Sequence, residues 1–139
     1  MEHNQKVVLD KGPTCSDPSR YRRLIGRLIY LTITRPEITY SVHILSQFMQ
    51  SPQQTHWDAA MRVLRYLKSS PGQGIILPKE NDLQLVAYCD SDWVSCPLTR
   101  RSTSGYLMKL GSAPVYWKTK KQSTVSNSSS EAEHRAMGQ

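Results

Sequence analysis

The sequence lacks long apolar runs: no stretch of about 18 apolar residues occurs in it, which excludes a membrane-spanning helix. Its first residues, MEHNQKVVLDKG, lack the apolar core of a secretion signal. Eight prolines and seven glycines are scattered rather than periodic, which excludes collagen-like or low-complexity character. The sequence therefore predicts a soluble protein of the cytoplasm or nucleus that is not secreted and has no membrane partner.

Cysteine is also scarce. Cys15, Cys89 and Cys96 are an odd number and form no C-x-x-C pair, so neither a disulfide framework nor a four-thiolate zinc site fits. The four histidines are widely spaced and show no ligand pairing. Any metal ion bound by this chain would therefore have to be held by carboxylates.

Acidic residues are few relative to basic ones: 11 Asp and Glu stand against 18 Lys and Arg, a formal net charge of +7. The excess is uneven, because residues 100–121 contain several basic residues and no acidic one. A second basic cluster opens the first predicted helix. Both clusters fit either solvated faces or a nucleic-acid site, since phosphate contacts need only clustered Lys and Arg. The two clusters consist of Arg100, Arg101, Lys109, Lys118, Lys120 and Lys121, and of Arg20, Arg22, Arg23 and Arg27.

The N-terminal half shows helical periodicity. Polar residues 1–20, with two prolines, predict a flexible lead-in, and residues 21–77 predict a small helical bundle. Thr34 and Glu37 have the spacing of a capping box for the second helix, and Thr55 is the expected cap of the third. The residues expected on the apolar helix faces are Tyr21, Leu24, Ile25, Leu28, Ile29, Ile38, Val42, Leu45, Phe48, Trp57, Ala60, Met61, Leu64 and Leu67.

After Gly74 the pattern changes from helical toward alternating, which is typical of strands. Residues 83–139 therefore predict three antiparallel strands followed by the start of a helix. The fold class expected for the whole chain is α+β. The predicted elements are strands at Leu83–Cys89, Ser104–Leu110 and Pro114–Lys118, a turn at Gly111–Ser112, a loop at Gln122–Ser130 and a helix at Glu131–Met137.

Two acidic positions are candidates for chemistry. Asp90 follows the first predicted strand, and Glu133 lies in the first turns of the last helix. Each also has a structural interpretation. Asp90 has the properties of a turn residue that bonds nearby backbone. Glu133 stands three residues after Ser130 in a capping-box pair, and Glu131 has the same relation to Ser128.

The longer sequence pattern resembles a known family. Residues Tyr21–Leu77, with the motif TRP, resemble the end of the reverse transcriptase in copia-type retrotransposon Pol polyproteins. Residues Leu85–Met137 resemble the start of the RNase H domain that follows it. The motifs that carry this second resemblance are DSDW at Asp90–Trp93, RRSTSG at Arg100–Gly105 and SSSEAEHRA at Ser128–Ala136.

The resemblance implies an activity and a site. The family's RNase H cleaves the RNA strand of an RNA–DNA hybrid with carboxylates that hold two divalent ions, usually Mg²⁺. Carboxylate oxygens suit Mg²⁺, so no Cys or His ligand is required. The match makes Asp90 and Glu133, rather than Glu131, the catalytic and metal-binding acids. The residues expected to contact nucleic acid are Arg100, Arg101, Lys118, Lys120, Lys121, Ser128 and Ser129.

The sequence also departs from the family pattern. Ser95 replaces a common glycine and His134 a usual tyrosine. The family's third and fourth carboxylates would follow Gln139, and the polymerase aspartates would precede residue 1. The resemblance therefore implies a truncated RNase H-like hydrolase unit that binds Mg²⁺ or Mn²⁺ weakly, if at all, and is inactive or nearly so alone. The alternatives are a domesticated module that binds nucleic acid or protein without cleavage, and a non-functional gene remnant.

The resemblance implies a further partner. A complete RNase H sheet has a parallel strand after its first helix, and that strand would lie beyond this sequence. One sheet edge would then be unpaired, and an unpaired edge invites association with another chain. We therefore expect self-association through that edge, in addition to binding of an RNA–DNA hybrid or another nucleic acid.

Overall fold

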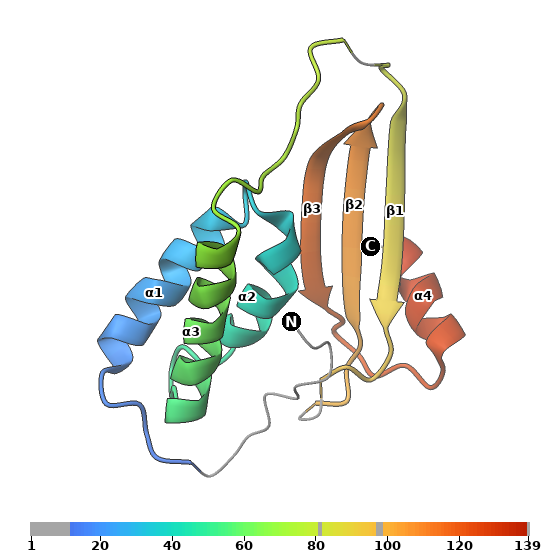
Figure 1. The fold of residues 1–139 in the computed structure, drawn as a ribbon. Coiled ribbons are helices and arrows are strands. Elements are labelled where there is room, and N and C mark those ends of the chain that lie inside the picture. The colour runs from blue at the N-terminus through green and yellow to red at the C-terminus, as the bar shows by residue number, and fades with distance from the viewer. Residues whose placement is uncertain (1–11, 81, 97–98, 139) are drawn as a thin grey trace. The chain divides into compact units, whose positions relative to one another are not determined.

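The computed structural model describes residues 12–80, 82–96 and 99–138, which fall into two compact units, residues 1–74 and 75–139. The first is helical, and the second has a three-stranded antiparallel sheet with one helix (Figure 1). The predicted α+β class is confirmed. No helix of the described residues is both long and apolar enough to cross a membrane. The elements are α1 (Pro18–Leu31), η1 (Pro36–Ile38), α2 (Thr39–Ser46), α3 (Gln54–Ser69), β1 (Leu85–Asp92), β2 (Thr103–Leu110), β3 (Ala113–Lys121) and α4 (Ser129–Met137).

Helix α1 begins three residues before the predicted start at Tyr21. The side chain of Asp17 caps it by accepting a 2.8 Å hydrogen bond from the amide of Arg20, and Pro18 occupies the first turn. The chain before the helix is also fixed: Cys15 is 5% exposed, and its amide donates to the carbonyl of Pro52. The part of the predicted flexible lead-in that is described, residues 12–20, is therefore packed or helical, and residues 1–11 lie outside the described residues.

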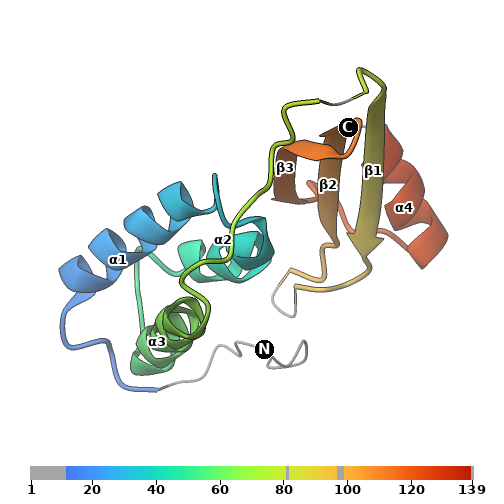
Figure 2. The ribbon, with the colours of Figure 1, turned by 45° about the horizontal axis from the view of Figure 1, so that its top comes forward.

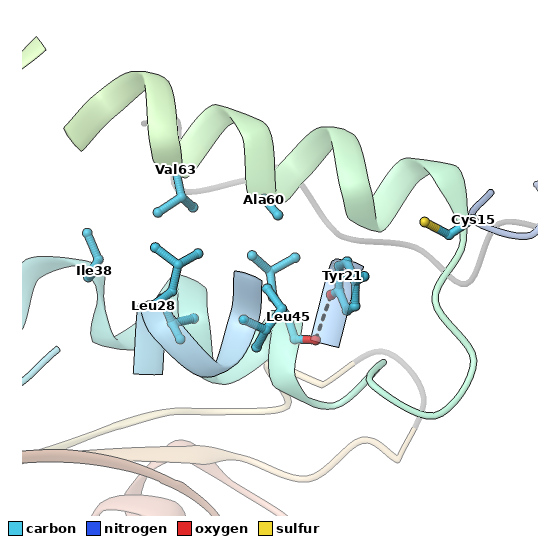
Figure 3. Close-up of a cluster of buried hydrophobic side chains, with 9 residues drawn as sticks. Cys15, Tyr21, Leu28, Ile38, Leu45, Ala60 and Val63 are labelled. Atoms are coloured by element: carbon cyan, nitrogen blue, oxygen red, sulfur yellow. Dashed lines mark hydrogen bonds between the residues drawn. The ribbon is translucent and has the colours of Figure 1, made fainter. Parts of the chain in front are cut away.

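The three helices of the first unit enclose one apolar core. Ala60 and Val63 of α3 point toward Leu28 of α1 and Leu45 of α2 (Figure 3). The hydroxyl of the fully buried Tyr21 donates a 2.8 Å hydrogen bond to the carbonyl of Leu45. The predicted apolar faces are confirmed at the residues that lie deepest in the core. These residues are Tyr21, Ile25, Leu28, Ile38, Val42, Leu45 and Ala60.

The TRP motif has a structural role. Arg35 is 5% exposed, and its guanidinium donates to the Glu37 carboxylate at 2.5 Å and to the carbonyl and hydroxyl oxygens of Ser70, both at 3.1 Å. The predicted capping box of Thr34 and Glu37 is wrong. Glu37 is paired with the buried charge of Arg35, and the hydroxyl of Thr34 donates to the carbonyl of Leu31. A buried guanidinium requires a counter-charge, and this need outweighs the cap.

The cap of α3 also differs from the prediction. Thr55 is exposed within the first turn, and the N-cap residue is Gln53. The amide of Gln53 donates to Nδ1 of His56 at 3.0 Å. The imidazole thus occupies the role that a Glu side chain has in an ordinary capping box.

The sheet of the second unit has the order β1-β2-β3, with β1 and β3 at its edges. Strand β1 runs through the acidic cluster to Asp92, whereas the sequence predicted that it stops before Asp90. Asp90 pairs with Gly105 of β2, which pairs with Thr119 of β3. Gly111, at φ 56°, provides the left-handed conformation of the predicted tight turn between β2 and β3.

Helix α4 packs against β1 and β2 (Figures 1 and 2). Ala132 and Ala136 are its buried residues, and their small side chains let the helix backbone lie close to the sheet. The helix begins at Ser129, two residues before the predicted start, because the hydroxyl of Ser128 accepts from the amide of Glu131 at 3.1 Å. Position 90 and position 133 are thus carried by adjacent elements.

Candidate carboxylate and nucleic-acid site

Asp90 lies within β1 and is exposed. Its Oδ1 accepts a 2.8 Å hydrogen bond from the amide of Ser91. This local bond to backbone is the kind expected of a structural aspartate, but the residue lies in a strand rather than in a turn. Its other carboxylate oxygen accepts no hydrogen bond from the described residues, so the side chain retains room for a ligand.

Glu131 and Glu133 differ in what they contact. The carboxylate of Glu131 accepts from the amide of Asn127 at 2.7 Å and from the guanidinium of Arg135 at 2.7 and 3.1 Å. The bond from the Asn127 amide, followed by that from Arg135, lowers the pKa of Glu131. Glu133 is exposed, and no described residue bonds to its carboxylate. The capping pair of α4 is therefore Ser128 with Glu131, which leaves Glu133 available for chemistry.

The two candidate acids lie on elements that pack together, Asp90 on the edge strand β1 and Glu133 on α4. Side chains alternate along a strand, so Asp90 and Ser91 point to opposite faces. Ser91 is on the face that α4 covers, because its hydroxyl lies 3.2 Å from Nε2 of Gln122, which bonds to the carbonyl of Ala132. Asp90 therefore belongs to the other face of β1, and Glu133 is exposed on α4.

The described residues do not fit a two-ion site. Nowhere among them do three or more His, Cys, Asp or Glu side chains gather closely enough to hold a metal ion. Asp92, on the same sheet face as Asp90, is the neighbouring acid, and it is exposed at the end of β1. One carboxylate facing the solvent leaves Mg²⁺ with most of its water ligands.

Gln122, which the sequence assigned to a loop, is the polar centre of the second unit. Its side chain is 1% exposed. Nε2 lies 3.2 Å from the Ser91 hydroxyl and 3.0 Å from that of Ser104, and donates to the carbonyl of Ala132 at 2.8 Å. Oε1 accepts from the hydroxyl of Ser126 at 3.1 Å. This one side chain joins two strands, α4 and the loop before it. The only signal in the sequence was its position directly after the last strand.

The predicted basic patch is divided between the two sheet faces. Lys118 and Lys120 are exposed on β3, opposite Tyr106 and Ser104 of β2, on the face that α4 partly covers. Lys121 belongs to the other face and is half-buried, with its Nζ 3.1 Å from the Sγ of Cys96. Lys118 and Lys120 are therefore the lysines that are placed to contact a large anionic ligand together.

Arg100 and Arg101 are exposed in the loop between β1 and β2. Arg100 adopts a left-handed conformation, φ 53°, and its amide donates to the carbonyl of Cys96 at 2.8 Å. It lines a shallow hollow of about 450 Å³ with Trp93 and Asn127. The backbone of Arg100 is thus held by a hydrogen bond, and the residue lies close to the loop that leads into α4.

The two predicted serine contacts differ. The Ser128 hydroxyl is used in the cap of α4, whereas Ser129 is the exposed first residue of that helix. Of the pair, Ser129 is the one whose hydroxyl is not required by the helix cap. A substrate contact through Ser128 would have to compete with the amide of Glu131.

A second basic surface lies on the first unit. Arg20, Arg23 and Arg27 of α1 line a hollow of about 400 Å³ together with Trp57 and Met61 of α3. The guanidinium of Arg20 lies over the Trp57 ring, 5.1 Å from its centroid. The sequence identified the arginine cluster but placed Trp57 in the core. In the structure Trp57 is only partly buried and joins the arginines at the surface.

These features belong to a chain whose relatives include proteins of transposons. Comparison with known proteins shows that it is similar over nearly its whole length to retrovirus-related Pol polyproteins. It is 45% identical over 137 residues to the Retrovirus-related Pol polyprotein from transposon RE2 of Arabidopsis thaliana, a match that covers 99% of this chain. The chain spans only 9% of that polyprotein.

Two shorter proteins match over a larger part of their own length. The Uncharacterized mitochondrial protein AtMg00810 of Arabidopsis thaliana is 46% identical over 137 residues, 99% of this chain and 56% of that protein. The Secreted RxLR effector protein 161 of Plasmopara viticola is 44% identical over 120 residues, 86% of this chain and 84% of that protein. No family model matches the chain, and no solved structure matches it significantly.

Proposed function

We propose that the chain corresponds to the junction between reverse transcriptase and RNase H in a copia-type Pol polyprotein. Three features support this position. The TRP motif lies in the helical unit, where Arg35 holds the end of α3. The DSDW and SSSEAEHRA motifs lie in the second unit, on β1 and at the start of α4. The boundary between the two compact units, after Gly74, lies three residues before the end of the first of the two segments that resemble those domains.

We further propose that this chain binds nucleic acid and does not hydrolyse RNA by itself. The observation that carries the proposal is the placement of charge in the second unit. Lys118 and Lys120 are exposed together on one sheet face, while the described residues contain no group of three or more His, Cys, Asp or Glu side chains that could hold a metal ion. Binding to phosphates requires only accessible basic groups, whereas hydrolysis requires acids that converge on the metal ions.

The chemistry explains why the number of converging acids matters. Two-metal hydrolysis needs ions about 3.5–4 Å apart that stabilise the attacking and the leaving oxygen. Among the described residues, no group of three or more His, Cys, Asp or Glu side chains is placed to hold such ions. We therefore expect Mg²⁺ or Mn²⁺ to bind weakly at Asp90 and Glu133. The residues assigned to this chain's function are accordingly its basic ones.

The salt dependence of binding tests the assignment of Lys118 and Lys120. Each phosphate contact contributes about −0.9 to the slope of log K against log salt concentration for duplex DNA. The double variant Lys118→Gln, Lys120→Gln should therefore bind an RNA–DNA hybrid more weakly, with a slope flatter by about 2. Fluorescence anisotropy of a labelled hybrid at several salt concentrations measures both quantities.

Lys121→Gln is the matched control, because it removes the same charge from the opposite face of the same strand. It should change the slope by less than half as much as the double variant. If the double variant and the wild-type chain have equal slopes, Lys118 and Lys120 form a solvated surface and the proposed binding site is wrong.

A further inference from the structure

We propose that β1 pairs antiparallel with β1 of a second copy of this chain, which gives a closed dimer with one continuous six-stranded sheet. The first observation is the position of β1. It is an eight-residue strand at the edge of the sheet, and within the described residues no strand pairs with its outer side. Such an edge presents a row of backbone N–H and C=O groups that can bind another strand.

The two edges of the sheet differ in their protection. Strand β3 carries Pro114 and three lysines, Lys118, Lys120 and Lys121, and its pairing with β2 shifts register at Lys109. Proline, lysine and irregular register are the features by which natural sheets prevent edge-to-edge pairing. The sequence of β1, LVAYCDSD, contains no proline or lysine, and its charged residues, Asp90 and Asp92, are confined to its C-terminal end. The β1 edge is therefore the less protected of the two.

This difference selects a second copy as the partner. An assembly that grew through both edges would form an open fibre, because nothing would limit its length. When only one edge accepts a strand, the same edge of a second copy completes the contact, and the assembly closes at two subunits. An isologous contact of this kind requires only that β1 be compatible with itself.

Charge and strand geometry fix the register. In a two-fold antiparallel pair within one sheet, one residue must lie opposite the same residue of the second copy. In any other register, the sheet face that α4 covers would lie on one side of the joined sheet in one copy and on the other side in the second copy. The two β1 strands overlap over nearly their full length only when either Tyr88 or Cys89 lies on the two-fold axis. With Cys89 there, the two Asp90 carboxylates become diagonal neighbours. With Tyr88 there, they are separated by about 13 Å along the strands, and Asp90 lies opposite Val86. Repulsion between the acids favours the Tyr88 register.

The exposed side chains of β1 agree with this register. Tyr88 is 56% exposed and Leu85 is 59% exposed. Pairing around Tyr88 places the two tyrosine rings directly opposite each other, an arrangement that favours aromatic residues. Leu85 then lies opposite Ser91 of the second copy. The contact covers apolar surface and brings no like charges into direct opposition.

The oligomeric state of the full chain tests this proposal. Sedimentation equilibrium should show a dimer that dissociates on dilution. Tyr88→Lys should yield a monomer, because it places two ammonium groups directly opposite each other at the axis. Tyr116→Lys is the matched control: Tyr116 is 46% exposed on the protected strand β3, and its substitution should leave the dimer intact. A wild-type monomer at high concentration, species larger than dimers, or equal effects of the two substitutions would overturn the proposal.

A second measurement avoids substitution and so does not depend on the folding of a variant. Cys89 is the exposed cysteine, whereas Cys15 and Cys96 are buried, so a spin label reacts selectively at Cys89. In the Tyr88 register the two Cys89 positions are diagonal neighbours, about 7–8 Å apart. The label should therefore show strong dipolar broadening that disappears when unlabelled protein is added in excess. A dimer without this broadening would mean that another surface forms the contact.

Discussion

His56 shows how one side chain can make the first unit sensitive to pH. Its ring is 1% exposed and stacks on Phe48, with ring centroids 3.9 Å apart. Nδ1 accepts from the amide of Gln53, so this nitrogen must be unprotonated. Burial lowers the pKa of His56 below its ordinary value of 6.5. The folded chain therefore holds this imidazole in the neutral form.

The free energy of unfolding should consequently fall as the pH is lowered below about 6.5. In that range the unfolded chain binds a proton at His56 that the folded chain binds less readily, so acid favours unfolding. Above this range the stabilisation is fully present. Chemical denaturation between pH 5 and 8, followed by helical circular dichroism, measures the effect.

The exposed His134 supplies the control for this measurement. His56→Gln should flatten the dependence of stability on pH, and His134→Gln should leave it as in the wild-type chain. If both variants keep the wild-type profile, then His56 is not the group whose protonation destabilises the first unit.

Residue patterns predicted some positions well and others poorly. Tyr21, Ile25 and Leu28 were predicted correctly because helical spacing alone selects the buried side of α1. The caps at Thr34 and Thr55 were wrong, because neighbouring side chains with stronger requirements, a buried arginine and a buried histidine, determine the local bonds. Such competition depends on burial, which a single sequence does not show.

At the scale of elements, the docking of α4 on the sheet depends on Gln122. Its amide contacts β1, β2 and α4, and the other buried groups of the helix are two alanines. Alanine burial alone contributes little apolar area. The polar contacts of Gln122 must therefore supply much of the specificity with which α4 is positioned.

Gln122→Leu should destabilise the second unit by about 2–4 kcal/mol, because it leaves three buried hydroxyls and a carbonyl without their partner. Gln84→Leu is the matched control at an exposed position just before β1, where the expected change is within about 0.5 kcal/mol. Urea denaturation gives the difference. Equal stability of Gln122→Leu and wild-type protein would show that the network around Gln122 is not stabilising.

The strands illustrate what an alternating pattern can and cannot predict. Leu83 and Leu85 lie in the strand predicted from the alternating pattern, but they are 81% and 59% exposed. An alternation of apolar and polar residues with a period of two identifies a strand, while the burial of its side chains depends on what packs against the strand. For the same reason the sequence located Asp90 but not the sheet face to which it belongs. Whether a strand residue faces a helix depends on register and on the side to which the helix returns.

At the scale of the whole molecule, the two units differ in their cores. The core of the first unit contains large side chains such as Tyr21, Ile25 and Leu28. Among the described residues of the second unit, the buried apolar side chains are small ones, Cys96 and three alanines. Since the hydrophobic contribution grows with buried apolar area, the second unit should be the less stable one.

Hydrogen exchange measures this difference directly. At a protein concentration low enough to keep the chain monomeric, amides of β1, β2 and β3 should exchange faster than those at the centres of α1 and α3. The expected order follows from core size alone. Slower exchange in the sheet than in the helices would mean that the second unit has a source of stability other than its small core.

The molecule as a whole combines a basic charge with few grouped acids. Its net charge is +7, which favours an anionic ligand, and no group of three or more His, Cys, Asp or Glu side chains able to hold a metal ion occurs among the described residues. We propose that this chain binds an RNA–DNA hybrid and leaves the RNA strand intact. Binding and cleavage must therefore be followed in the same sample.

The most direct test is a single-turnover assay with a fluorescent RNA–DNA hybrid, saturating protein and Mg²⁺ or Mn²⁺. The account predicts that the hybrid is bound, as shown by its anisotropy, and that the RNA strand remains full-length, with wild-type and Asp90→Asn protein indistinguishable. RNA cleavage by the wild-type chain that Asp90→Asn abolishes would contradict the account, because it would show that Asp90 takes part in a working hydrolytic site.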